Sequence, residues 1–290
     1  MANGGRSKLG APTEGRALSD VFSTDEIFQR ITAVADEEAE RSSRLLLFSG
    51  VSAGLAIGLS FVARISLTGL VGEGFASNLL YPVGFILVVI GRYQLFTEET
   101  LTPLTLVLTR LASLPNLLRL WGVALLGNLI GAATVAFLTS VPGVMTPEAM
   151  AAGRDIAGHA LEVPTLPLFL KAQGAGFIVA SMVWLIHAAR SITARVLIVY
   201  FLMLLIPVAE FYHCIIGACE VLFLVLDGGA NLSEAARFFV TVMLGNTVGG
   251  VVLVALLNYG QTHDPRHAEE ATGRRLLPWR EFRFGRPRGE

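Results

Sequence analysis

Residues 209–220 read AEFYHCIIGACE and lie in a very apolar part of the chain, between IVYFLMLLIPV (198–208) and VLFLVL (221–226). Ionisable side chains inside a membrane are costly and normally face a pathway. Irregular backbone at membrane depth is tolerated only where it is buried in protein or lines a cavity. Because Pro207 removes a backbone donor just before the cluster, the sequence predicts a broken membrane helix with His213 at the break.

The composition of the whole chain also favours a membrane protein. Of its 290 residues, 53% are hydrophobic and 16% are charged, whereas soluble domains average about 25% charged residues. The net charge is −1 and no basic block is interleaved with aromatic residues, which argues against a nucleic-acid partner. The two cysteines, Cys214 and Cys219, lack metal-ligand spacing, so we expect packing roles for them and no cofactor.

Six apolar segments predict an all-α membrane protein. Each is long enough for a span, which needs about 20 residues. The segments cover residues 45–63, 79–109, 120–140, 166–189, 196–226 and 238–258. The second segment is interrupted by GRYQLFTEETLTP (91–103), and the fifth is interrupted by the stretch quoted above. We therefore predict six spans, of which the second and fifth are broken helices.

The distribution of arginine and lysine predicts the orientation. Basic residues concentrate near both ends of the chain and in the loops after the second and fourth spans. By the positive-inside rule, both termini are expected in the cytoplasm and the loop 141–165 outside, in a multi-pass protein of the inner or plasma membrane. The expected organisation is a tail at 1–44, a membrane domain at 45–258 and an arginine-rich tail at 259–290.

Two similar stretches indicate an internal repeat. GNLIGAATVAFL (127–138) resembles GNTVGGVVLVAL (245–256) at an offset of 118 residues, and the two breaks are separated by nearly the same distance. A repeat with three spans inserts in opposite orientations, so 45–140 and 166–258 are expected to form an inverted repeat. The alternative is chance similarity between spans rich in small residues. Asn128 and Asn246 occupy matching positions, where we expect structural hydrogen bonds between helices.

Five motifs, taken in order and at compatible spacing, carry a resemblance to a known family. They are GFILVVIGRYQLFTEETL (84–101), WGVALLGNLIGAA (121–133), ASMVWLIHAARS (180–191), FYHC (211–214) and TVMLGNTVGGVVLV (241–254). Together they resemble the formate/nitrite transporter family over nearly the whole membrane region.

The resemblance implies an aquaporin-like inverted repeat that assembles as a homopentamer in the lipid bilayer, with one pore per protomer. It implies transport of small monovalent anions of weak acids, linked to protons, and no enzymatic activity. Two apolar constrictions flank a central histidine in the family, and His213 matches that histidine. From the residues alone, a neutral histidine hydrogen-bonded at a helix interface is the alternative for His213.

Further residues on the expected path follow from the same resemblance. Thr97 matches a threonine placed to hydrogen-bond near the histidine, and Leu95 and Phe96 match apolar residues of a constriction. Phe85 is expected to line the pore, with ordinary core packing as the alternative.

Three positions on the expected path depart from the family pattern. Gly176 and Gly217 stand where asparagines are usual, and Tyr212 replaces a glutamate. Lysines that attract anions to a pore mouth are also sparse, since the chain has only Lys8 and Lys171. These departures predict an altered anion preference.

Four further charged residues, Glu210, Glu220, Glu98 and Glu99, lie near the breaks. Glu210 is expected either to hold the broken loop or to pair with Arg92. Glu220 is expected nearer the outer end, as a solvated or interfacial residue. No partner is predicted for Glu98 and Glu99. Paired charges near the cytoplasmic mouth would balance their negative charge.

Three rival functions are weighed against anion transport. A neutral-solute pore of the aquaporin type is disfavoured because no pair of NPA motifs is present. An intramembrane enzyme with His213 as base and Cys214 as nucleophile has poor geometry, because adjacent residues rarely point at one another. A non-conducting sensor or scaffold remains open because of the departures at 176 and 217.

Overall fold

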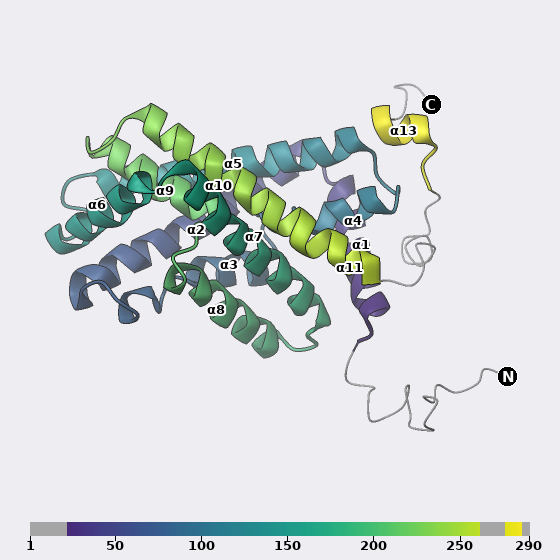
Figure 1. Ribbon diagram of the computed structural model, residues 1–290, viewed down its shortest axis with the longest axis horizontal. Helices are drawn as coiled ribbons and strands as arrows, with labels where there is room; N and C mark the ends of the chain where they lie inside the picture. The colour runs from purple at the N-terminus through teal and green to yellow at the C-terminus, as the bar shows by residue number, and fades with distance from the viewer. Residues whose placement is uncertain (1–21, 262–275, 286–290) are drawn as a thin grey trace.

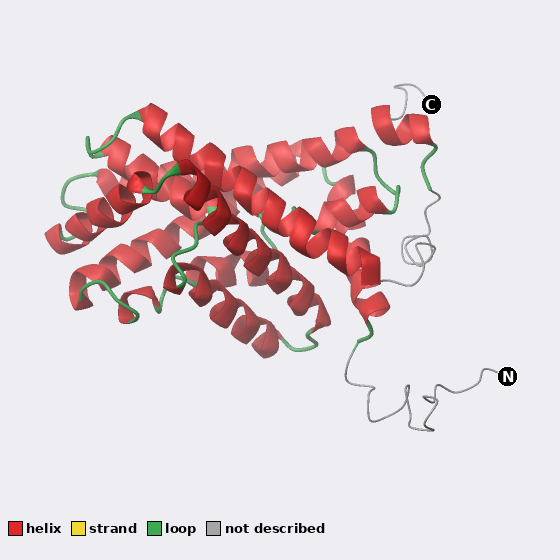
Figure 2. Ribbon diagram, viewed as in Figure 1, coloured by secondary structure: helices red, strands yellow, loops and turns green. Residues whose placement is uncertain are grey.

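The computed structural model describes residues 22–261 and 276–285, in which the regular elements are helices (Figure 2). The glycine- and serine-rich start of the chain and most of the arginine-rich tail lie outside the described residues. Three described helices are long and apolar enough to cross a membrane alone: α2 (Ser43–Val71), α5 (Leu114–Ser140) and α7 (Thr165–Ala188).

The other spans are shorter or interrupted. The second predicted segment forms a short 3-10 turn, η1 (Ala76–Asn78), then α3 (Val83–Gly91) and α4 (Thr102–Leu108). The fifth forms α8 (Ile192–Val208) and α9 (Cys214–Leu226). The sixth forms α10 (Leu232–Gly250), which continues through a π-helical stretch (Val251–Leu256) into α11 (Leu257–Gln261). Both predicted helix breaks are therefore present.

Glycines bring the long helices together in two matching pairs, α2 with α5 and α7 with α10. A Cβ added at Gly54 of α2 would collide with the backbone carbonyl of Asn128, and one added at Gly176 of α7 would collide with that of Asn246. Gly131 and Gly249 make the reciprocal approaches from α5 and α10. The same helix contact thus recurs in both halves, as expected for a repeat of three spans.

The glycine contacts predict a large effect of a single methyl group. Gly54→Ala and Gly176→Ala are each expected to lower the free energy of unfolding by about 1–3 kcal/mol, because overpacking forces two backbones apart. The matched control is Gly122→Ala in α5, where an added Cβ meets nothing within 4 Å. Thermal unfolding in one detergent measures all three variants. Equal melting temperatures for the three would contradict this account of the helix pairs.

Two helices lie in segments that the sequence assigned to a tail and a loop. α1 (Thr24–Glu40) falls within the predicted tail 1–44, yet Ile27 and Ile31 are buried and the helix packs against α4 and α7. α6 (Pro147–Glu162) occupies the predicted loop 141–165 and packs against α2 and α9. α1 was not predicted from the sequence, and its amphipathic face packs against the membrane domain.

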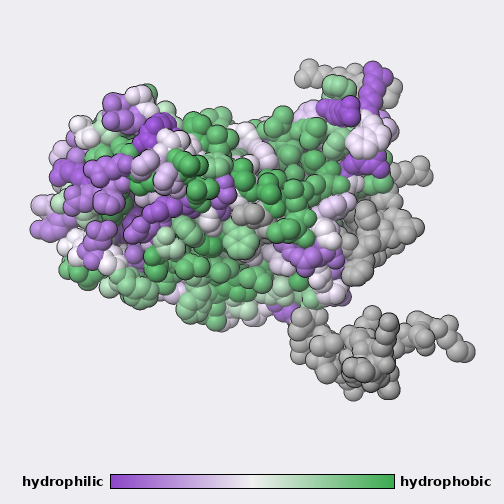
Figure 3. Space-filling view, viewed as in Figure 1, coloured by the Kyte–Doolittle hydropathy of each residue, from purple (hydrophilic) through white to green (hydrophobic). Residues whose placement is uncertain are grey.

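The ends of the molecule differ in composition from its middle. α1, α11 and α13 (Trp279–Phe284) lie at one end, and α6 lies at the opposite end (Figure 1). Between the ends, Figure 3 shows a broad hydrophobic surface. The large hydrophobic side chains exposed on the spans include Phe201 and Leu205 of α8 and Leu244 of α10. Hydrophilic residues gather at the α6 end. This pattern fits a protein whose middle faces lipid.

Candidate functional site

The two helix breaks meet at a buried histidine–threonine pair. His213 ends the 209–213 break and caps the N-terminus of α9, and Thr97 lies in the 92–101 break between α3 and α4. Thr97 Oγ1 lies 2.8 Å from His213 Nε2, and each residue is 1% exposed. The ring of Phe85 stands edge-on to the imidazole at 5.0 Å between centroids. Thr97 and His213 are 116 residues apart in the sequence but are in contact in the folded protein.

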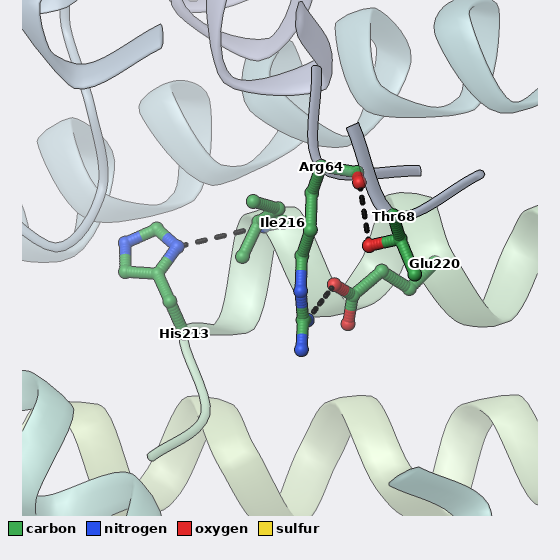
Figure 4. A network of polar contacts seen from close by, with 5 residues as sticks. All are labelled: Arg64, Thr68, His213, Ile216 and Glu220. Atoms are coloured by element: carbon green, nitrogen blue, oxygen red, sulfur yellow. Dashed lines mark hydrogen bonds and ion pairs between the residues drawn. The ribbon is translucent and has the colours of Figure 1, made fainter. Parts of the chain in front are cut away.

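The hydrogen bonds indicate which ring nitrogen carries the proton in a neutral His213. The backbone N–H of Ile216 points at Nδ1 across a long contact of 3.5 Å (Figure 4). A neutral imidazole has one donor and one acceptor nitrogen. With Nδ1 accepting from Ile216, Nε2 carries the proton and donates to Thr97 Oγ1. The Thr97 hydroxyl then has its own proton to offer to a polar solute.

One asparagine holds the break that carries Thr97. Asn128 of α5 accepts a hydrogen bond from the Phe96 backbone N–H at 2.8 Å. Its side-chain amide donates to the Gln94 carbonyl at 2.8 Å and to the Gly50 carbonyl of α2 at 2.9 Å. Backbone groups that leave a helix at membrane depth have no water to bind. Asn128 supplies the partners that these groups need.

The second asparagine repeats the arrangement at the break that carries His213. Asn246 of α10 accepts from the Cys214 backbone N–H at 2.8 Å and donates to the carbonyls of Tyr212 at 2.9 Å and Ala172 at 2.8 Å. The matching bonds span 32 and 34 residues in both halves. The two asparagines therefore fix the positions of Thr97 and His213, a task beyond the interhelical bonding that the sequence suggested.

A cavity of about 440 Å³, which we call the α6-side cavity, reaches His213 from the end of the molecule that carries α6. Tyr212, Ile216 and Glu210 also line it. Glu210 forms an ion pair with Lys171 at 2.8 Å, with its side chain 77% exposed. The suggested pairing of Glu210 with Arg92 is wrong, because Arg92 lies near Glu37 instead, at 3.7 Å.

Glu220 also lines the α6-side cavity, where it pairs with Arg64. Arg64 Nη1 of α2 lies 3.0 Å from Glu220 Oε1, and the Glu220 side chain is only 4% exposed. The expectation of a solvated Glu220 is wrong, because a charged residue within the apolar sequence of α2 reaches across to it. Charged residues in or beside apolar segments are a general signal of pairing at membrane depth, but they do not identify which partner each residue has.

A second cavity of about 480 Å³, which we call the α1-side cavity, opens at the opposite end. Its arginine, histidine and glutamate lining residues are Arg30, Arg41, Arg92, Arg195, His187, Glu38, Glu98 and Glu99. The arginines provide positive charge at this mouth, where the sequence showed few lysines. Arg30 and Arg41 were not predicted at this cavity, because they belong to the segment assigned to a tail.

Carboxylates in the α1-side cavity gather around one amide. Gln94 Nε2 donates to Glu38 Oε1 at 2.8 Å and to Glu99 Oε1 at 3.0 Å, and Arg41 donates to Gln94 Oε1 at 2.8 Å. Burial raises the pKa of Glu38, and the hydrogen bond from Gln94 opposes that rise. This network ties α1 to the break that carries Thr97.

Phe85 lies between the two cavities. Tyr81, one turn before it, lines the α6-side cavity, and Val88, one turn after it, lines the α1-side cavity. Leu95 is fully buried in the same apolar cluster. Phe96 instead packs edge-on against Trp121 of α5, with centroids 6.1 Å apart. The closed section between the cavities is thus built around Phe85, His213 and Thr97.

The two glycines that replace expected asparagines are packing positions. Gly176 faces the backbone of Asn246, and a Cβ at Gly217 would come 2.7 Å from the ring of Phe238. Both sit where α10 approaches another helix, which accounts for glycine at these two positions; a place for them on the path stays a prediction. Tyr212 does line the α6-side cavity, with its ring against Phe238.

Comparisons with known proteins agree with this architecture. A model of the formate/nitrite transporter family matches residues 25–260. The inner membrane protein YfdC of Escherichia coli (strain K12) is 31% identical over 242 residues, covering 81% of this chain and 77% of that protein. The formate channel FocA of Haemophilus influenzae is 25% identical over 283 residues, covering 84% of this chain and 96% of that protein.

Solved structures share the fold. An FNT family ion channel superposes with a TM-score of 0.74 at 22% identity, covering 82% of this chain and 99% of its own. A pentameric formate channel with formate bound gives a TM-score of 0.61 at 24% identity, covering 75% and 96%. The family consists of transporters and channels, which excludes the intramembrane enzyme. The chain belongs to the formate/nitrite transporter family.

Proposed function

We propose that the protein carries small monovalent anions of weak acids, such as formate or nitrite, across the membrane, with proton linkage through His213. The observation that carries this proposal is the buried His213–Thr97 pair, 2.8 Å apart, at the inner end of the α6-side cavity. An anion entering a low-dielectric section loses hydration. An imidazole that donates a hydrogen bond or a proton offsets part of that loss.

The assembly and orientation belong to the same proposal. Relatives named as formate channels, one of them pentameric, support a homopentamer of this chain. The arginine-lined α1-side cavity supports a cytoplasmic position for that end, since basic residues favour the cytoplasmic side. A reporter inserted in the 141–146 loop is then expected to read as outside the cell, and a cytoplasmic reading there contradicts the orientation.

Flux measurements in proteoliposomes test the proposed function. Purified protein is expected to accelerate the entry of formate and nitrite, with a rate that rises when the external pH falls below the internal pH. Glycerol serves as the neutral solute and empty liposomes as the background. Glycerol entry without anion entry would favour the neutral-solute pore, and no flux of either kind would favour the sensor or scaffold.

A further inference from the structure

Arg64 occupies an unusual position for a charged side chain. It lies within α2, and it is the one arginine or lysine among the described residues that line the α6-side cavity. Its side chain is 20% exposed, while its partner Glu220 is almost completely buried. Figure 4 shows Arg64 extending past Ile216 to meet Glu220. The carboxylate thus holds the guanidinium at the cavity wall.

Most of the donor capacity of Arg64 is unused. Nη1 donates to Glu220 Oε1 at 3.0 Å. The other two guanidinium nitrogens, Nε and Nη2, form no hydrogen bond among the described residues. They are also not among the buried nitrogens that lack a partner, so they are not buried. They are therefore accessible nitrogens on a residue that lines the cavity. A guanidinium presents its N–H groups in a planar fork that matches two oxygens of a carboxylate.

The position of the pair along the path is well defined. Glu220 lies seven residues after His213 on α9, which places it about 10 Å farther along the helix axis. Both residues line the α6-side cavity. An anion that reaches His213 from this side passes Arg64 first.

The remaining charges of the cavity limit how strongly an anion binds there. Glu73, Glu210 and His159 also line it, and Glu210 is paired with Lys171. Glu220 neutralises much of the charge of Arg64. A conducting path requires sites that bind strongly enough to attract a solute and weakly enough to release it.

We propose that Arg64, held by Glu220, is an anion-binding subsite for small planar oxyanions with two acceptor oxygens, such as a carboxylate or nitrite, on the α6 side of His213. This inference rests on the proposed function and adds a second site to it. Glu220 acts as a positioning residue that also weakens binding at the subsite. A purely structural ion pair between α2 and α9 is the competing account.

Two variants with opposite expected effects distinguish these accounts. Glu220→Gln keeps a hydrogen-bond acceptor for Arg64 but removes the competing charge. The formate concentration that gives half-maximal flux is expected to fall by about threefold or more, because a full guanidinium charge becomes available. The double variant Arg64→Gln/Glu220→Gln is a neutral pair of similar size, and this concentration is expected to rise by about tenfold. Arg64→Gln alone is avoided because it leaves a buried charge without a partner.

The matched control is a second ion pair outside both cavities. Arg154 of α6 lies 2.6 Å from Asp227 at the end of α9, and neither residue lines the α6-side or the α1-side cavity. The double variant Arg154→Gln/Asp227→Asn is expected to leave the half-maximal concentration unchanged. Melting temperature and elution volume establish that all variants are folded.

The outcomes separate the subsite from the proposed function. Initial formate fluxes are measured in proteoliposomes in both directions at constant ionic strength. If the half-maximal formate concentration falls in Glu220→Gln and rises in the double variant Arg64→Gln/Glu220→Gln, the result supports the subsite. Folded variants with the half-maximal concentration of the wild type, or with shifts in the same direction, overturn the subsite while leaving anion transport in place. A wild-type protein that moves no anion overturns both.

Discussion

Replacing His213 with phenylalanine is expected to reduce formate flux at neutral pH by more than about tenfold, with any residual leak insensitive to pH. The reason is the cost of several kcal/mol for moving an anion into low dielectric, where about 1.4 kcal/mol corresponds to tenfold. Phenylalanine fills the space beside Phe85 but offers no donor to the anion and no partner for Thr97 Oγ1. Isotope uptake into proteoliposomes measures the effect.

The matched variant for this experiment is His213→Asn. Asparagine is a favourable N-cap residue, so the start of α9 keeps its cap and part of the hydrogen bonding survives. Flux is expected to persist in this variant. A phenylalanine variant that folds, assembles and transports like the wild type with the same pH profile would contradict a role for His213 in transport.

Asn128→Ala and Asn246→Ala are each expected to lower the free energy of unfolding by more than about 3 kcal/mol. Each substitution removes three hydrogen bonds to backbone groups, and each buried group left without a partner costs about 1–3 kcal/mol. The breaks are short and lie within the protein, so water does not readily replace the amide. Thermal unfolding in detergent, followed by elution volume, measures the effect.

The control for the asparagine variants is Asn116→Ala. Asn116 lies near the start of α5 and its side chain accepts one hydrogen bond, from Arg119 Nε. Its loss is expected to change the free energy of unfolding by no more than about 1 kcal/mol. If Asn128→Ala and Asn246→Ala melt at the same temperature as Asn116→Ala, the asparagines do not hold the breaks.

The sequence contained most of the information needed for the fold. Continuous apolar runs located all six spans, since a bilayer sets the length of a span regardless of its partners. Pro207 and the polar stretch 91–103 located both breaks. α1 was missed because it is amphipathic and charged, so its burial depends on the surface that it covers.

The site was predictable in part. The FYHC motif and the offset between the breaks indicated that His213 and Thr97 would meet. Single residues gave no indication of which partner lies across a helix interface, so the pairing of Arg64 with Glu220 was not foreseen. For the same reason, Gly176 was interpreted as a lost polar group, although its lack of a side chain is what allows α7 to approach α10.

Proton movement during formate uptake tests the central claim most directly. Wild-type protein and the His213→Asn variant are reconstituted with an internal pH indicator, and formate and proton entry are followed together between external pH 5 and 8. The account predicts proton entry with formate in the wild type, rising as the external pH falls, and formate entry with little pH dependence in the variant. The same proton entry and the same pH profile in both proteins would contradict proton linkage through His213.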